Sequence, residues 1–116
     1  MLKKSTVLLV SIGLALVSCG KVQNTLIVTN HSGVTADRVA VTVCGEVYLF
    51  SGLTNGGAQT RHFRVTGDSG FKVSATLADG TTLTNGFGYV TGGAGSYGNH
   101  ASLEIRQDRQ IIGHQP

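Results

Sequence analysis

Residues 71–77 read Phe-Lys-Val-Ser-Ala-Thr-Leu, and this stretch decides the fold class. Apolar residues occupy every second position from Phe71 to Leu77, and Lys, Ser and Thr stand between them. Successive side chains of a β-strand point to opposite faces of a sheet, so the pattern predicts a strand with one buried and one solvated face. Asp79-Gly80 follows closely and favours a tight turn, because glycine adopts positive φ without steric cost. We therefore expect a hairpin at this place.

The same alternation recurs on both sides of this hairpin. The further runs cover residues 26–29, 38–44, 47–50, 62–66, 83–89 and 103–105. Segments rich in Gly, Asn, Asp and Ser separate them, and no long segment keeps the 3.6-residue apolar spacing of a helix. The pattern predicts an all-β domain over residues 25–116, a small antiparallel sandwich of about seven strands. Its general plan resembles the immunoglobulin-like and transthyretin-like sandwiches, and residues 25–112 should be almost wholly strand and turn.

Length and composition exclude several other classes of protein. The chain has 116 residues, which is room for one domain, since domains usually contain about 100–150 residues. A TIM barrel, at about 250 residues, does not fit. With 13% charged residues and apolar residues throughout, the chain lacks the composition of a disordered protein. Two cysteines are too few for a disulfide-rich miniature scaffold.

The first 18 residues have the pattern of a secretory signal peptide. Lys3 and Lys4 supply the positive start, and a largely apolar run covers residues 7–17. A membrane-spanning helix needs about 20 apolar residues, so this run is short for an anchor. We expect residues 1–18 to be removed as a signal peptide.

The end of this segment carries a more specific motif. Leu16-Val17-Ser18-Cys19 resembles the lipobox of bacterial lipoprotein signal peptides. The resemblance implies cleavage before Cys19, a diacylglycerol thioether on that residue and acylation of the new terminus, with palmitate as a typical chain. Residues 19–24 would then form a lipidated tether, and Gly20 would favour the outer membrane, facing the periplasm. An ordinary signal peptide followed by a chance cysteine is the alternative.

The mature chain offers little support for nucleic-acid binding. Cleavage leaves 116 − 18 = 98 residues and removes two lysines, so 9 − 2 = 7 basic residues face 6 acidic ones. No basic stripe with interleaved aromatics remains. With Cys19 lipidated, Cys44 has no partner for a disulfide, and its Val-rich surroundings predict a structural role. We expect no cofactor.

A possible catalytic motif is Gly67-Asp68-Ser69-Gly70, which matches the string around the nucleophile of chymotrypsin-like proteases. His31 and Asp37 precede Ser69 in the order that such a triad takes, and His62 is a second candidate base. That fold has two barrels, however, and 98 residues provide about half of it. We therefore interpret this string as a polar turn between two strands. The six carboxylates are scattered, and we predict that the protein is not an enzyme.

The histidines give no metal-binding motif. They stand at His31, His62, His100 and His114, without an HxH, HxxxH or HExxH spacing. Metal coordination would need the fold to bring distant histidines together, and we predict no metal site.

Residues 92–99 form the segment that is least like a core. Four of these eight residues are glycine, and the Lys and helix of a phosphate-binding loop are absent. We expect a mobile surface loop whose Tyr97, Asn99 and neighbouring His100 form a candidate contact surface, since Tyr, Ser, Gly and Asn are adaptable recognition residues.

These observations favour a lipid-anchored protein of the cell envelope, a non-catalytic binding or structural module in the periplasm or at the cell surface. Its partners would be the membrane, through the anchor, and an envelope protein or cell-wall component. Two alternatives remain. One is an inhibitor or immunity-type lipoprotein that blocks a cell-wall hydrolase with residues 92–100, and the other is a small serine hydrolase that uses Ser69. Fold class alone does not separate them.

Overall fold

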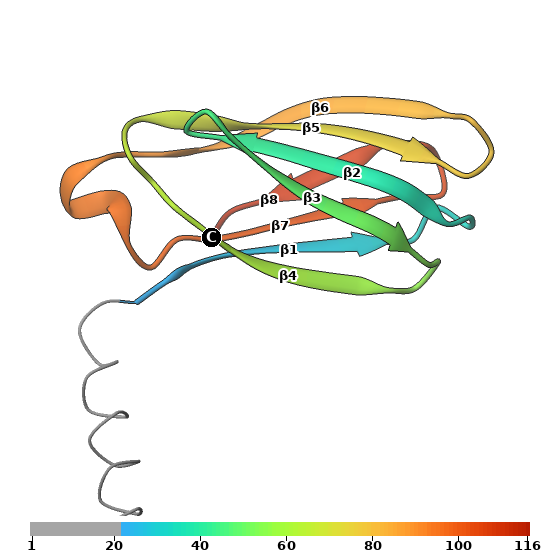
Figure 1. Cartoon of the computed structure of the whole chain (residues 1–116), viewed down its shortest axis with the longest axis horizontal. Coiled ribbons are helices and arrows are strands. Elements are labelled where there is room, and N and C mark those ends of the chain that lie inside the picture. The colour runs from blue at the N-terminus through green and yellow to red at the C-terminus, as the bar shows by residue number, and fades with distance from the viewer. Residues whose placement is uncertain (1–21) are drawn as a thin grey trace, which may run out of the picture.

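The computed structural model describes residues 22–116, which form two four-stranded sheets packed as a sandwich (Figure 1). One sheet has the strand order β4-β1-β7-β8 and the other β3-β2-β5-β6. The strands are β1 (Asn24–Asn30), β2 (Ala36–Val43), β3 (Glu46–Leu53), β4 (Ala58–Phe63), β5 (Ser69–Leu77), β6 (Thr82–Val90), β7 (His100–Ile105) and β8 (Ile111–His114). A short 3₁₀ turn, η1 (Gly93–Ser96), precedes β7. The all-β sandwich predicted from alternation is confirmed, with eight strands instead of about seven.

The predicted alternation places the core between the two sheets. Phe71 and Leu77 are buried at the two ends of the β5 repeat, and Lys72, between Phe71 and Val73, is exposed. The larger core side chains are Leu26, Val28, Val39, Val41, Val43, Phe50, Leu53, Phe63, Phe71, Val73, Leu77, Val90, Leu103, Ile105 and Ile111. Burying a Val, Leu, Ile or Phe side chain contributes about 1.5–3 kcal/mol, so this layer is the main source of stability.

Turn chemistry fixes two hairpins. Asp79-Gly80 joins β5 to β6 as expected, with Gly80 at φ +88°. Cys44 and Gly45 join β2 to β3, and both have positive φ, which is the conformation of a type I′ turn. Cys44 therefore lies in a turn and not on the strand that the sequence pattern extended through it.

Three other expectations need correction. The pairing is not antiparallel throughout, because β1 and β7 are parallel, with Val28 opposite Leu103. β4 ends at Phe63, so residues 64–66 follow the strand that the alternation predicted there. β8 was not predicted, since only Ile111 of its four residues is buried and no alternation shows.

The two sides of the sandwich close differently. On the β6–β8 side, the Asn85 amide donates to the carbonyl oxygen of Ile111 at 2.6 Å. The Gln115 side chain accepts a hydrogen bond from the N–H of Tyr89 and donates one to its carbonyl oxygen. On the β3–β4 side, the Arg61 guanidinium lies 5.4 Å from the Phe50 ring centre.

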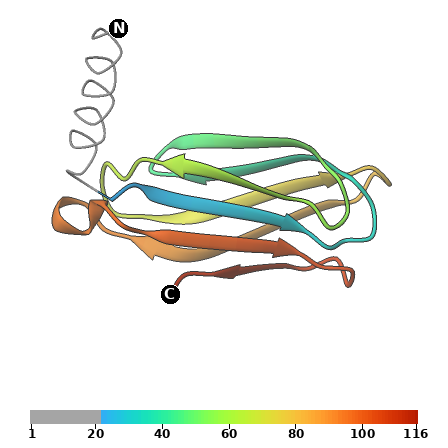
Figure 2. The same cartoon turned by 90° about the horizontal axis from the view of Figure 1, so that it is seen from below.

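Figure 2 shows η1 and the start of β1 at the same end of the sandwich. Within residues 22–116 there is no helix with the length and apolar character needed to cross a membrane.

Candidate functional site

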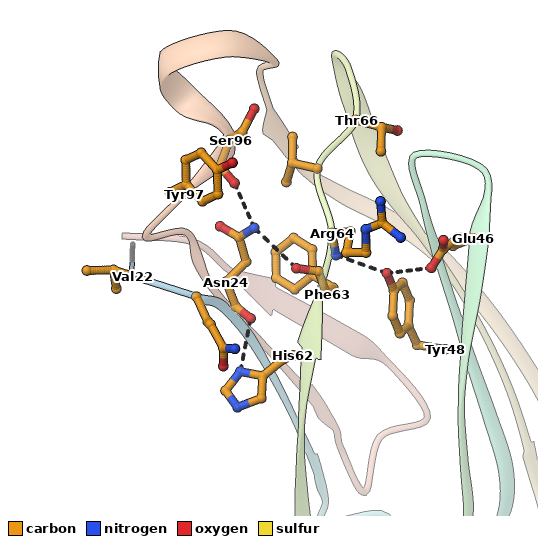
Figure 3. Close-up of a pocket in the computed structure, with 12 residues that line it drawn as sticks. Val22, Asn24, Glu46, Tyr48, His62, Phe63, Arg64, Thr66, Ser96 and Tyr97 are labelled. Carbon is orange, nitrogen blue, oxygen red and sulfur yellow. Dashed lines mark hydrogen bonds between the residues drawn. The ribbon is translucent and has the colours of Figure 1, made fainter. Parts of the chain in front are cut away.

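A recess of about 490 Å³ opens between the edge strands β3 and β4, at the end of the sandwich where η1 lies (Figure 3). β3 and β4 are edge strands of different sheets, and the recess lies where these two edges meet, at the end of β4. Its lining combines aromatic rings with charged and amide side chains from β1, β3, β4, residues 64–66 and the η1 segment. Pockets with a few placed polar groups on an apolar surface are the usual form of a binding site.

Aromatic rings form the inner surface of the recess. Phe63, the last residue of β4, is buried and contacts Tyr48 edge-on, with ring centres 6.4 Å apart. Phe63 also packs edge-on against Phe71 at 5.4 Å, and Phe71 stacks on Phe87 at 5.0 Å. Such aromatic pairs are favourable beyond their buried area. The wall beside Tyr48 is therefore continuous with the core and held rigidly by it.

The Tyr48 hydroxyl links β3 to the residue that follows β4. It accepts a hydrogen bond from the backbone N–H of Arg64 at 3.0 Å and donates one to the Glu46 carboxylate at 2.9 Å. Burial raises the pKa of Tyr48, and the hydrogen bond to Glu46 acts in the same direction, against the lowering effect of the Arg64 N–H. The phenol is therefore a neutral hydrogen-bonding group at physiological pH.

The opposite wall is the segment around η1, which a buried asparagine attaches to β1. The Asn24 amide donates to the carbonyl oxygens of Ser96 at 2.8 Å and Phe63 at 3.2 Å. Tyr97 follows Ser96 at the rim of the recess and is 51% exposed, and Val22 beside it is 64% exposed. This rim presents one aromatic and one aliphatic side chain to solvent.

The three residues predicted as a contact surface have different surroundings in the structure. Tyr97 lines the recess. The Asn99 amide donates internally, to Asn24 Oδ1 and to the Gly95 carbonyl oxygen, both at 2.9 Å. His100 lies on β7, with its Nδ1 2.7 Å from Thr25 Oγ1. Of the three, only Tyr97 belongs to the recess.

The sequence pattern does not identify Tyr48, Glu46 and Arg64 as members of one site. Glu46 and Tyr48 share a face of one strand, which the two-residue spacing makes visible. Their proximity to Arg64 depends on how two different sheets meet, and no local pattern encodes that relationship.

Ser69 of the protease-like string lies at the start of β5 and is bonded to backbone groups. Its Oγ accepts from the N–H of Cys44 and donates to the carbonyl oxygen of Gly70, both at 2.9 Å. The Cys44 thiol donates to the Gly67 carbonyl oxygen at 3.3 Å, and Asp68 accepts from the N–H of Gly92 at 2.9 Å. The Gly67–Gly70 string therefore joins the β2–β3 turn to the segment that precedes η1.

In residues 22–116, no three His, Cys, Asp or Glu side chains lie together as metal ligands.

The fold defines a small two-sheet β-sandwich protein. A solved structure described as an NMR structure of a protein from Eubacterium rectale has a similar fold, with a TM-score of 0.59 and 17% sequence identity. The match covers 85% of this chain and 93% of that one. No protein-family model matches the sequence, and neither does any curated protein. At this level of identity the likeness shows the fold alone.

Proposed function

We propose that this chain is a lipid-anchored, non-catalytic binding module of the bacterial cell envelope, and that the recess between β3 and β4 takes part of an envelope partner. The observation that carries the proposal is the recess itself, in which a rigid aromatic wall meets polar groups. The lipobox-like motif ending at Cys19 supplies the anchor. Cys19 and the tether up to Lys21 lie outside the described residues.

The chemistry of the recess favours a protein segment as the ligand. Tyr48 and Phe63 offer aromatic surface, while Glu46 and Arg64 offer opposite charges on the same rim. Tyrosine, phenylalanine and arginine are enriched at protein interfaces, where aromatic anchors fill pockets and charges set orientation. A loop or extended segment of the partner that carries an apolar side chain and a charged group has the matching chemistry.

The place of the recess relative to the tether limits where the partner can lie. Val22, which lines the recess, is the third residue after Cys19. An extended chain covers at most about 3.6 Å per residue, so a lipid on Cys19 would keep this end within roughly 10 Å of the bilayer surface. The partner site would then be close to the membrane, as for an integral or lipid-anchored envelope protein.

The anchor is tested by mass spectrometry of the full-length protein from membranes of a bacterial host. We expect an N-terminal peptide that begins at Cys19 and carries the added mass of the diacylglycerol and acyl chains. A Cys19→Ser variant should keep its leader and lose that mass. Recovery of an unmodified Cys19 from a soluble periplasmic fraction would remove the anchor from this proposal.

The binding site is tested separately with a photo-crosslinking amino acid at position 97 or at position 89. Tyr97 and Tyr89 are similarly exposed, at 51% and 58%, but only Tyr97 lines the recess. In intact cells we expect one discrete cross-linked envelope protein from position 97 and none from position 89. Arg64→Glu should abolish that product. Equal products from both positions would contradict a specific site in the recess.

An inhibitor of a cell-wall hydrolase remains a second candidate, because Asn24 and Asn99 hold the η1 segment in one conformation with Tyr97 exposed. A rigid, protruding segment is the form that active-site blockers take, since ordering costs are then low. Activity assays of purified muramidases and peptidoglycan amidases with added protein distinguish this candidate. Inhibition that Tyr97→Ala removes would favour it over the binding module.

A further inference from the structure

β3 and β6 are the two edge strands of one sheet (Figure 1), and their backbone groups are bonded differently. At the β6 edge, side chains take these groups. Asn85 Oδ1 accepts from the N–H of Gly86 at 2.8 Å. The Gln115 side chain accepts from the N–H of Tyr89 and donates to its carbonyl oxygen, both at 2.8 Å. Unpaired N–H and C=O groups on an edge strand are a template for another chain, so these contacts close β6 to such pairing.

The edge strands of the other sheet are protected in other ways. β8 has only four residues, and the carbonyl oxygen of Ile111 is bonded by Asn85. β4 carries Arg61 opposite the core residue Leu26, so this arginine points to the inner side of the sheet, where its guanidinium lies over Phe50. Short edge strands and inward-pointing charges are means by which proteins prevent edge-to-edge association.

Among the edge strands of residues 22–116, β3 alone has none of these protections over residues 46–51. It has eight residues, and its single charged side chain, Glu46, stands at its start. Asn30 donates to the carbonyl oxygen of its last residue, Leu53, at 2.8 Å, and within the described chain no other side chain bonds its backbone. Val47 and Leu49 are exposed on its outer face. β3 is therefore an open edge with apolar side chains beside it.

The two-residue turn between β2 and β3 determines which backbone groups of β3 face outward. The pair that flanks such a turn, here Val43 with Glu46, exchanges hydrogen bonds. Hydrogen-bonded and non-hydrogen-bonded pairs alternate along an antiparallel ladder. Val47, Leu49 and Ser51 therefore belong to non-hydrogen-bonded pairs, and their N–H and C=O groups point away from β2.

We infer that β3 pairs with β3 of a second copy of this chain, antiparallel and about a two-fold axis at Leu49. In that register Leu49 faces Leu49 of the second copy, and Val47 faces Ser51. Because the three outward-facing residues are evenly placed about Leu49, this pairing gives each of their N–H and C=O groups a partner. A two-fold interface of this kind is self-complementary, and it joins the two sheets into one continuous sheet.

The side chains of β3 also fit a second copy. The exposed side chains of Val47 and Leu49 from both copies gather around the axis on the outer face of the joined sheet. The two Glu46 carboxylates lie at opposite ends of the paired strands, so no like charges meet. Glu46 and Tyr48, which line the recess, belong to the other face of β3. The inference goes beyond the proposed function and depends on neither the anchor nor the partner.

The test is sedimentation equilibrium of the full-length protein in a detergent matched in density to the buffer, so that only protein mass is measured. We expect the mass of two chains, with reversible dissociation on dilution. Leu49→Lys should raise the dissociation constant about tenfold or more, because it places two ammonium groups opposite each other at the axis. Ile112→Lys is the matched control and should leave the constant unchanged, since Ile112 is 42% exposed on β8 and Leu49 is 41% exposed.

Amide hydrogen exchange shows whether the backbone of β3 mediates the association, and it needs no variant. Exchange at the N–H groups of Val47, Leu49 and Ser51 should slow as the wild-type concentration rises, since these groups become bonded only in the dimer. A monomer at every concentration would overturn the inference and leave this edge to a strand of another protein. A dimer with fast exchange at these three residues, or the same dissociation constant for Leu49→Lys and Ile112→Lys, would overturn it as well.

Discussion

Asn24 and Asn99 are joined by two hydrogen bonds across 75 residues of sequence. Asn24 Oδ1 accepts from the backbone N–H of Asn99 and from its side-chain amide, both at 2.9 Å. The Asn24 amide nitrogen in turn donates to Ser96 and Phe63. One buried side chain thus connects β1, the end of β4 and the η1 segment. The glycine-rich segment that the sequence predicts as a mobile loop is attached to the sandwich at this point.

The first prediction follows from this connection. Asn24 is 4% exposed, and Asn24→Ala leaves the carbonyl oxygens of Phe63 and Ser96 and the Asn99 amides without their partner. Loss of a partner costs about 1–3 kcal/mol for each buried polar group left unsatisfied. We expect the free energy of unfolding in urea to fall by about 2–4 kcal/mol, with faster amide exchange over residues 93–99. Asn85→Ala, which removes fewer bonds, one to the Ile111 carbonyl oxygen and one from the Gly86 N–H, should cost less and leave that exchange unchanged.

A second prediction concerns the close approach of β8 to β6. A Cβ atom on Gly113 would lie 2.1 Å from Cγ of Phe87, so the ring would have to give up its stacked position on Phe71. Gly113→Ala should therefore lower the free energy of unfolding by about 1–3 kcal/mol through overpacking. Gly67→Ala is the control, because nothing lies within 4 Å of its Cβ position. Thermal unfolding followed by circular dichroism measures both. Equal effects of the two variants would contradict this packing.

The sequence predicts most of the strands because their faces differ in polarity. Val39 and Val41 alternate with Ala40 and Thr42, and the structure buries both valines between the sheets. The sequence does not predict β8, because a strand of four residues with one buried side chain shows no alternation of apolar and polar residues. The parallel pairing of β1 with β7 also escaped, since register between strands so far apart in sequence depends on the whole topology.

The recess is harder to predict from sequence than the core. Its aromatic wall belongs to an apolar pattern that any strand of a sandwich shows, and Glu46 and Arg64 look like ordinary exposed charges. The buried asparagines are equally inconspicuous. Asn30 is fully buried and donates to the carbonyl oxygens of Val34 and Leu53, yet asparagine in sequence favours a turn. Only the arrangement of the two sheets gives these residues their roles.

A third prediction concerns stability in acid. The pKa of Asp79 is lowered, first by its hydrogen bonds with Thr81 and then by the Arg109 guanidinium, whose Nη2 is 2.7 Å from Oδ2. Because the folded-state pKa lies below the ordinary value of 3.8, Asp79 contributes stability above that pH and loses it as pH falls through the folded value. The melting temperature of Asp79→Asn should accordingly change less than that of the wild type as pH falls from about 4.5 to 2.5.

The control for this measurement is Asp37→Asn, since the structure gives the Asp37 side chain no hydrogen bond or ion pair. Its melting temperature should follow the wild-type dependence on pH. Parallel curves for Asp79→Asn and the wild type would show that the turn contacts of Asp79 do not favour the charged carboxylate.

The last prediction distinguishes the structural role of Ser69 from a catalytic one. Both hydrogen bonds of its hydroxyl go to backbone atoms, at Cys44 and Gly70, whereas a nucleophilic serine needs a bonded base and oxyanion donors. Ser69→Ala should lower the free energy of unfolding by about 1–2 kcal/mol, because it removes two hydrogen bonds that contribute roughly 0.5–1.5 kcal/mol each. A fluorophosphonate probe should leave the wild-type protein unlabelled, with a known serine hydrolase as positive control. Stoichiometric labelling that disappears in Ser69→Ala would instead make this protein a hydrolase, because only an activated hydroxyl reacts with the probe.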